Sequence, residues 1–277
     1  MYDRVAMRRL LAIAALFLCT AADWGDVSTP AAGPPRIVGT YTAGCIQGAV
    51  PLLPEAPGYE AVRLSRNRHW GHPTAIEFVT IFAEQVRQRG QTHLYIGDIA
   101  MPRGGPFSFG HASHQIGLDI DIWFERAPRP RLAGPQREDI MRRSIVRADE
   151  SGIDDQVFSA QHATLLQLAA AMPNVDRMFV HKWIKRRLCE TTTGNRAWLR
   201  KLVPWIGHDS HFHVRLYCPP GQPECQPQAG YAQDDGCGDA LELWFRAPPV
   251  VAPPAGVPRP PYRPRLPAAC QAVLNAP

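Results

Sequence analysis

Two short segments, residues 117–123 and 211–217, alternate strictly between apolar and polar positions. A period of two is typical of a β-strand, in which successive side chains point to opposite faces of the sheet. The faces opposite the apolar residues carry Asp119, Asp121 and Trp123 in the first segment and His211, His213 and Arg215 in the second. If the two strands are neighbours in one sheet, a carboxylate and a histidine from different strands can converge on one point.

Other segments show helical periodicity. From Pro73 to Arg87, apolar residues recur at helical spacing, with Pro73 suited to a first turn and Gly90 just past the end. Four further elements are predicted, namely helices over 160–172 and 195–203 and strands over 94–99 and 177–181. Together the patterns predict one α+β domain built on a central, mainly antiparallel sheet with flanking helices.

The first 22 residues have the pattern of a secretory signal peptide. Arg4, Arg8 and Arg9 precede an apolar run that ends at Cys19, and small residues follow. The run is shorter than the roughly 18 apolar residues that a membrane-spanning helix needs, and no later stretch approaches that length. We therefore expect residues 1–22 to be a signal peptide and the exported protein to have no membrane span.

Composition changes at both ends of the remaining chain. Residues 23–36 are rich in glycine, proline and alanine and are predicted to be a flexible lead-in. Residues 37–246 are predicted to form the folded domain, and residues 247–277 a proline-rich C-terminal strap. Because Cys270 lies in this last segment, a disulfide would tie it back to the domain.

Six cysteines remain after the predicted signal peptide, an even number in an exported chain: Cys45, Cys189, Cys218, Cys225, Cys237 and Cys270. Three structural disulfides are the expected outcome. No CxxC pair suggests metal binding by these thiols. The residues alone allow fifteen connectivities, and only the short separation of Cys218 and Cys225 favours a particular pair.

The charge of the chain excludes one class of partner. The formal net charge is +5, and it falls to about +3 without residues 1–22, which contain three arginines and one aspartate. The basic residues are scattered among acids, whereas nucleic-acid binding uses a concentrated basic face, so no nucleic-acid partner is expected. The sequence does not determine the oligomeric state.

Five of the ten histidines lie in two short clusters, which are His111 and His114 in GHASHQIGLDIDIW and His208, His211 and His213 in GHDSHFHVRL. Imidazole and carboxylate are ligands that zinc prefers, and a catalytic site uses three of them so that water can occupy the fourth position. A histidine from each cluster and a strand-borne aspartate supply such a set. The alternative is that these histidines only make ordinary hydrogen bonds. That alternative does not explain why two histidine clusters occur together with the strand-borne carboxylates Asp119 and Asp121.

These motifs resemble those of the penicillin-insensitive murein endopeptidases, within the superfamily of lysostaphin-type and D-Ala-D-Ala peptidases. The resemblance covers nearly the whole exported chain and includes GTYTAGCIQGA, RHWGHP, IGDIAMPRGG and RAWLRKLVPW. It implies that residues 37–246 are a metallopeptidase domain with zinc in a surface groove. It also implies a periplasmic, β-lactam-insensitive endopeptidase that hydrolyses D-alanyl-meso-diaminopimelyl cross-links of peptidoglycan.

Matching positions imply roles for six residues. Zinc would be held by His114, Asp121 and His213, with His111 as an additional or alternative ligand. His211 would be the general base, and His208 would orient water or bind the oxyanion. The resemblance further implies the disulfides Cys45–Cys270, Cys189–Cys237 and Cys218–Cys225. A second metal position near Asp149 is not carried over, because Gly152 stands where a histidine would be needed.

Three further residues on the polar faces of the two predicted strands have expected roles. Asp119 is expected to orient a ligand histidine. Arg215 could pair with a substrate carboxylate or stabilise the oxyanion, and its alternative is a surface salt bridge. Trp123, just past Asp121, is a candidate for a wall that faces the substrate.

Two other functions remain open at this stage. A D,D-carboxypeptidase of the same superfamily could use the same site, because the two substrates differ little around the scissile bond. A non-catalytic module that binds cell wall would lack a ligand or the base, and all of these residues are present. A serine enzyme of the penicillin-binding kind would need Ser-x-x-Lys and Lys-Thr-Gly, and neither motif occurs.

Overall fold

The computed structural model describes residues 23–90, 93–127, 130–231, 234–246 and 262–277. The predicted signal peptide and residues 247–261 of the predicted strap lie outside these ranges. The helices are α1 (Pro73–Gln88), α2 (Gly134–Glu138), α3 (Ala160–Ala171), α4 (Lys182–Thr191), α5 (Asp239–Arg246) and α6 (Ala269–Leu274), and three 3-10 turns are η1 (Trp24–Asp26), η2 (Leu64–Arg66) and η3 (Ala197–Lys201). The strands are β1 (Arg36–Thr40), β2 (Ala43–Gln47), β3 (Val50–Pro51), β4 (Glu55–Ala56), β5 (Tyr59–Ala61), β6 (Trp70–Gly71), β7 (Leu94–Ile96), β8 (Asp119–Arg126), β9 (Val175–Val180), β10 (Leu202–Pro204) and β11 (His211–Leu216). This mixture of helices and sheets confirms the predicted α+β class.

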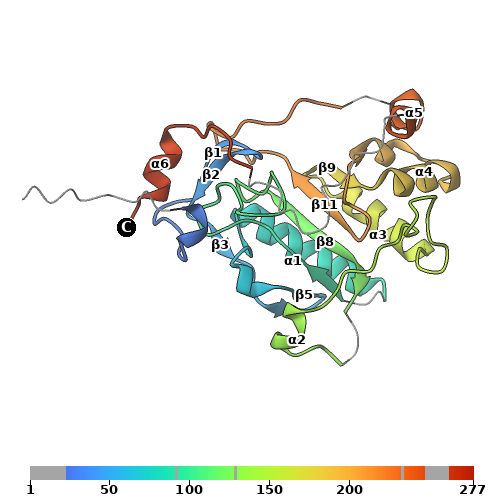
Figure 1. The fold of residues 1–277 in the computed structure, drawn as a ribbon, viewed down its shortest axis with the longest axis horizontal. Helices are drawn as coiled ribbons and strands as arrows, with labels where there is room; N and C mark the ends of the chain where they lie inside the picture. The colour runs from blue at the N-terminus through green and yellow to red at the C-terminus, as the bar shows by residue number, and fades with distance from the viewer. Residues whose placement is uncertain (1–22, 91–92, 128–129, 232–233, 247–261) are drawn as a thin grey trace, which may run out of the picture.

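A seven-stranded sheet with the order β10-β9-β11-β8-β7-β5-β4 forms the centre of the molecule (Figure 1). β11 pairs antiparallel with β8 and β9, and β8 pairs antiparallel with β7. The β9–β10 and β5–β7 pairs are parallel, so the sheet is mixed. The two alternating segments are therefore neighbours, and their register sets His213 opposite Asp121 and Arg215 opposite Asp119.

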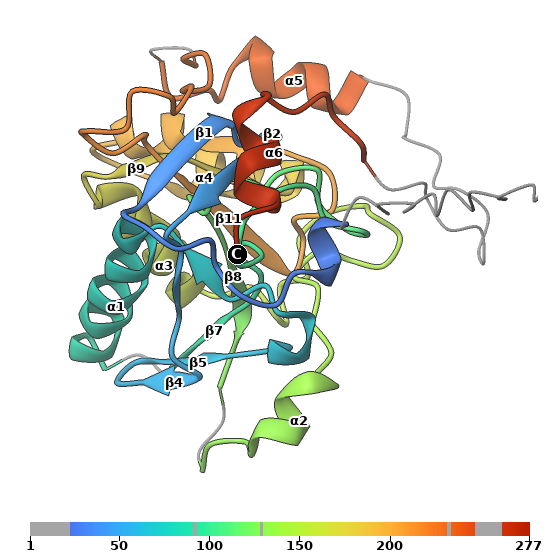
Figure 2. The ribbon, with the colours of Figure 1, turned by 90° about the vertical axis from the view of Figure 1, so that its left-hand side faces the viewer.

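The apolar face of β8 and β11 packs into the main hydrophobic core. Ile120, Ile122, Phe212 and Val214 are all fully buried there. The same core contains the buried sides of α1 and α3, which lie together on one side of the sheet (Figure 2). Because side chains alternate along a strand, burying this face directs the aspartates and histidines of both strands to the other face.

Two predicted elements differ from the structure. The helix predicted over 195–203 is a 3-10 helix, Ala197–Lys201, followed by strand β10. The apolar spacing there suits a helix, but β10 instead pairs in parallel with β9, an interaction between distant segments that local periodicity does not reveal. The strand predicted over 94–99 ends at Ile96, after which the backbone bonds to β8 and to the loop before β6.

The two ends of the described chain pack together on one side of the domain. Trp24 and Ala31, within the predicted lead-in, are buried in a small cluster with Val273 and Leu274. Figure 2 shows α6 beside β1 and β2. A guanidinium nitrogen of Arg103 donates to carbonyl oxygens at the end of α6, including that of Leu274 at 2.8 Å. Among the described residues, no helix has both the length and the apolar character needed to cross a membrane.

Three disulfides join the described segments, namely Cys45–Cys270, Cys189–Cys237 and Cys218–Cys225. These are the pairs that the family resemblance implies. The first bridge links β2 to α6 across 225 residues of sequence. It therefore attaches the C-terminal helix covalently to the strand pair formed by β1 and β2.

We expect the double variant Cys45→Ala/Cys270→Ala to lose more free energy of unfolding than Cys218→Ala/Cys225→Ala. The first bridge spans 225 residues and the second spans 7, and loop-closure entropy then predicts a difference of about 3 kcal/mol. Urea unfolding followed by tryptophan fluorescence measures both losses. Equal losses would contradict this entropic account.

Candidate metal centre and active site

Four potential metal ligands converge on the polar face of β8 and β11. Asp121 and His213 stand opposite each other in the sheet, and His111 and His114 reach them from the loop before β8. One donor atom of each residue lies within 4.8 Å of the others, and only His111 is partly exposed. The structure thus brings together all four residues that the sequence predicted as ligands.

The carboxylate of Asp121 is the centre of this group. Its Oδ2 lies 3.1 Å from Nε2 of His111, and its Oδ1 lies 3.4 Å from Nε2 of His114 and 3.6 Å from Nδ1 of His213. Burial opposes ionisation, but electrostatic attraction from the neighbouring His111 and His114 holds the pKa of Asp121 well below its usual value. Asp121 is therefore a buried anion surrounded by imidazole nitrogens.

The donor atoms of this group fit a bound cation. Nε2 of His114 and Oδ1 of Asp121 are buried, and neither has a hydrogen-bond partner among the described residues. A buried polar atom without a partner costs about 1–3 kcal/mol unless a ligand satisfies it. Zinc prefers imidazole nitrogen and carboxylate oxygen, so His114, Asp121 and His213 suit it as three ligands, with His111 as a fourth.

The backbone around His114 holds its ring in place. Its φ is 71°, in the left-handed region that non-glycine residues rarely adopt. Its backbone N–H donates to Oδ2 of Asp119 at 3.0 Å. Nδ1 lies 2.8 Å from the carbonyl oxygen of Ile99, which can only accept. Nδ1 therefore donates to this carbonyl, and Nε2, which faces Asp121, is the nitrogen available to a metal.

Asp119 orients the second candidate ligand histidine, His213. Oδ1 of Asp119 lies 2.9 Å from Nε2 of His213, so the ring presents Nδ1 to Asp121. Burial raises the pKa of Asp119, but the charges of Arg215 and His213 outweigh it and lower the pKa. Asp119 is thus ionised, and its position matches the role expected of it beside a ligand histidine.

Arg215 is buried beside Asp119. Its side chain is buried, and Nε and Nη2 donate to the two oxygens of Asp119 at 2.8 and 3.1 Å. The guanidinium also lies 4.2 Å from the ring centroid of Tyr41 and 4.9 Å from that of Phe179. Arg215 therefore forms a salt bridge, as one interpretation expected, but the pair is buried and not at the surface, because the strand register places Arg215 opposite a buried aspartate.

His208 and His211 lie beside the four candidate metal ligands and form a second set of close donor atoms with His111. Nδ1 of His208 lies 2.9 Å from the carbonyl oxygen of Ile206. Since a carbonyl only accepts, Nδ1 carries the proton and Nε2 the lone pair. Nδ1 of His211 lies 3.1 Å from Nη1 of Arg142. Since arginine only donates, Nδ1 accepts and Nε2 carries the proton.

The remaining nitrogens of these two histidines face the site. Nε2 of each is buried without a hydrogen-bond partner among the described residues, and Nε2 of His211 lies 3.6 Å from Oδ1 of Asp121. Burial lowers the pKa of His208 to about 3 and that of His211 well below its usual value. Both rings are therefore neutral at pH 7. Nε2 of His208 presents a lone pair to the site, and Nε2 of His211 presents an N–H.

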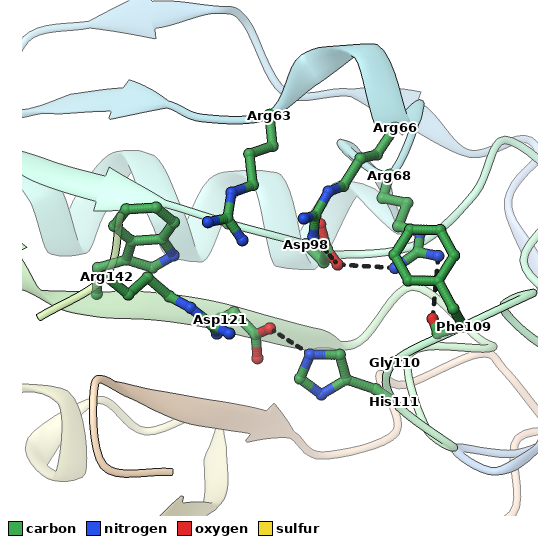
Figure 3. A pocket seen from close by; sticks show the side chains of 11 residues that line it. Arg63, Arg66, Arg68, Asp98, Phe109, Gly110, His111, Asp121 and Arg142 are labelled. Carbon is green, nitrogen blue, oxygen red and sulfur yellow. Dashed lines mark hydrogen bonds and ion pairs between the residues drawn. The ribbon is translucent and has the colours of Figure 1, made fainter. Parts of the chain in front are cut away.

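A pocket of about 190 Å³ adjoins Asp121 and His111 (Figure 3). Its walls are rich in cationic and aromatic side chains, including Arg63, Arg66, Arg68, Phe109, Trp123 and Arg142. Asp98 also lines it and pairs with Arg68 at 3.0 Å. The candidate metal ligands therefore lie at the edge of an arginine-rich pocket.

Trp123 lines this pocket, where the sequence placed a possible substrate-facing wall, although its side chain is almost fully buried. The arginines were not identified from the sequence. Three of them fall within residues 63–68, but they follow no strand or helix period, and Arg142 lies far along the chain. The clustering of arginine in RLSRNR was the only local signal, and it did not indicate a partner segment.

The fold and the site together define a mixed α+β protein that is cross-linked by disulfides. In it, a buried group of histidines and an aspartate could hold a metal ion and adjoins a pocket. Such a group beside a pocket would suit the active site of a hydrolase.

Comparison with known proteins identifies the family. The chain matches the penicillin-insensitive murein endopeptidase family over residues 37–275. A similar protein is the penicillin-insensitive murein endopeptidase of Haemophilus influenzae, which is 40% identical over 282 residues that cover 99% of this chain and 97% of that protein. Another is the penicillin-insensitive murein endopeptidase of Klebsiella pneumoniae, which is 39% identical over 272 residues that cover 98% of this chain and 97% of that protein. The chain belongs to the penicillin-insensitive murein endopeptidase family, as its motifs indicated, and is a hydrolase that acts on peptide bonds.

We expect Asp121→Asn to weaken zinc binding by more than about 100-fold, because replacing a residue that merely supports a ligand already costs about 10–100-fold. Titration of the metal-free protein with zinc, followed by calorimetry, measures the affinity. Asp149→Asn is the matched control, since Asp149 is exposed, accepts from the backbone of Ser151 and belongs to neither potential ligand group among the described residues. Equal affinities for the two variants would remove Asp121 from the ligand set.

Proposed function

We propose that this protein is a zinc-dependent endopeptidase that hydrolyses D-alanyl-meso-diaminopimelyl cross-links of peptidoglycan and is insensitive to β-lactams. The observation that carries the proposal is the buried group of His114, Asp121 and His213, whose donor atoms suit zinc, in a chain of this family. The names of the relatives support peptidoglycan as the substrate. The disulfides and the sequence pattern of residues 1–22 support a periplasmic location.

Zinc bound here would polarise the scissile carbonyl and lower the pKa of a bound water to about 7. The chain contributes the orientation of the ligands. The carbonyl of Ile99 holds the ring of His114, and Asp119 holds that of His213. Both rings would therefore offer a fixed nitrogen without a rearrangement, which favours tight binding.

The hydrogen bonds of His208 and His211 support different roles for the two rings. Nε2 of His208 has the lone pair needed to accept a proton from the attacking water and to return it to the leaving amine. Nε2–H of His211, whose other nitrogen accepts from Arg142, can donate to the carbonyl oxygen as negative charge develops there. This assignment exchanges the roles that the family resemblance implies, in which His211 is the base.

The proposed reaction is tested by release of monomers from purified, cross-linked muropeptide dimers. We expect the untreated protein to cut the dimers, a chelator to abolish cleavage, and zinc but not magnesium to restore it, because magnesium favours oxygen ligands. Liquid chromatography with mass spectrometry follows the products. Release of terminal D-alanine from intact dimers would instead indicate a D,D-carboxypeptidase, and zinc binding without any turnover would indicate a wall-binding module.

The two histidine roles are separated by glutamine substitutions. A glutamine NH₂ group can still donate a hydrogen bond, but glutamine cannot act as a base near neutral pH. We therefore expect His208→Gln to lower kcat by about 100-fold or more, the usual contribution of a general base, and His211→Gln to retain more activity. Dimer cleavage kinetics at saturating zinc measure both. The opposite order would return the role of base to His211.

A further inference from the structure

We infer that the pocket in Figure 3 is a carboxylate-binding subsite, in which Arg63 and Arg142 bind the carboxylate carried by the carbon next to the scissile amide nitrogen. This inference rests on the proposed function and names the chemical group by which that site would recognise its substrate. The pocket is lined by Asp121 and His111 themselves, so a group bound in it lies next to the metal-binding group.

The pocket has an excess of positive charge. Four arginines and two aspartates line it. Asp121 belongs to the metal-binding group, and Asp98 lies 3.0 Å from Arg68 and 3.5 Å from Arg66. Within the described part of the chain, neither Arg63 nor Arg142 has a carboxylate at ion-pair distance. These two cations are therefore free to pair with an anionic substrate group.

The two guanidinium groups are held close to the same place. Their central carbons lie 5.0 Å (Arg63) and 6.0 Å (Arg142) from the ring centroid of Trp123. Arg63 also donates to the carbonyl oxygen of Ile140 at 3.0 Å, which fixes the end of its side chain. In Figure 3 both guanidinium groups point towards the space in front of Asp121. A ligand group there can contact both.

Crowding of like charges favours an anion between these side chains. Burial lowers the pKa of Arg63, and the charges of Arg66 and Arg142 lower it further. A bound carboxylate would relieve this repulsion. Guanidinium and carboxylate also match in shape, because two parallel N–H groups can donate to the two oxygens.

The proposed substrate carries such a group at the right place. In the D-alanyl-meso-diaminopimelyl cross-link, the amide nitrogen is attached to the D-centre of diaminopimelate, and that carbon carries a free carboxylate. Only this carbon separates the carboxylate from the scissile amide. A subsite that adjoins the metal-binding group can therefore bind the carboxylate while the amide is cut.

The test compares two cross-linked dimers that differ in one group, the D-centre carboxyl, which is free in one and amidated in the other. We expect amidation to lower kcat/KM of the unmodified protein at least tenfold, the usual scale for loss of a charge-assisted hydrogen bond. Arg63→Gln should lower kcat/KM for the free acid by a similar factor and leave the amidated dimer nearly unaffected. Arg143→Gln, an exposed arginine outside this pocket, is the matched control and should change neither.

The outcomes separate the subsite from the function. Equal cleavage of both dimers by the unmodified protein would overturn the subsite and leave the proposed endopeptidase activity intact. An equal loss on both dimers in Arg63→Gln would also overturn it, because a structural role does not distinguish an acid from an amide. Cleavage of neither dimer by the zinc-loaded protein would remove the proposed function and the subsite with it.

Discussion

The arrangement of the site depends on the buried carboxylate of Asp119. It accepts two hydrogen bonds from Arg215 and one from the backbone of His114, and it lies 2.9 Å from the ring of His213. Burying a carboxylate costs free energy unless such partners surround it, so the fold needs these contacts to keep Asp119 buried. The charge of Asp119 thereby links β8 to β11 and fixes His114 and His213 relative to Asp121.

The burial of the sheet also fixes the position of this network. β8 and β11 are buried on both faces, with an apolar face against α1 and α3 and a polar face that carries the site. A shift of the register by one residue would exchange the two faces and bury the histidines in the core. The large apolar area on one side therefore determines which side chains are available for chemistry on the other.

The loop that supplies His111 and His114 is supported from outside the sheet. Gln115 accepts from the backbone of Gly44 at 3.1 Å and donates to the carbonyl of Thr42 at 2.8 Å. These residues belong to the β1–β2 hairpin, which the disulfide from Cys45 joins to α6. The terminal segments, although remote from the reaction, thus stabilise the hairpin against which the ligand loop packs.

The sequence by itself determined the α+β class and the two alternating strands with their polar faces, because strand period is a local property of the chain. The set of His114, Asp121 and His213 came from the resemblance of its motifs to a known family. Only the tertiary structure decided the features that arise where distant segments meet. Strand register buried Arg215 against Asp119, and hydrogen bonds from separate loops set which nitrogens of His208 and His211 carry protons. The pocket lined by the arginines of residues 63–68 and by Arg142 depends in the same way on packing between segments that share no sequence period.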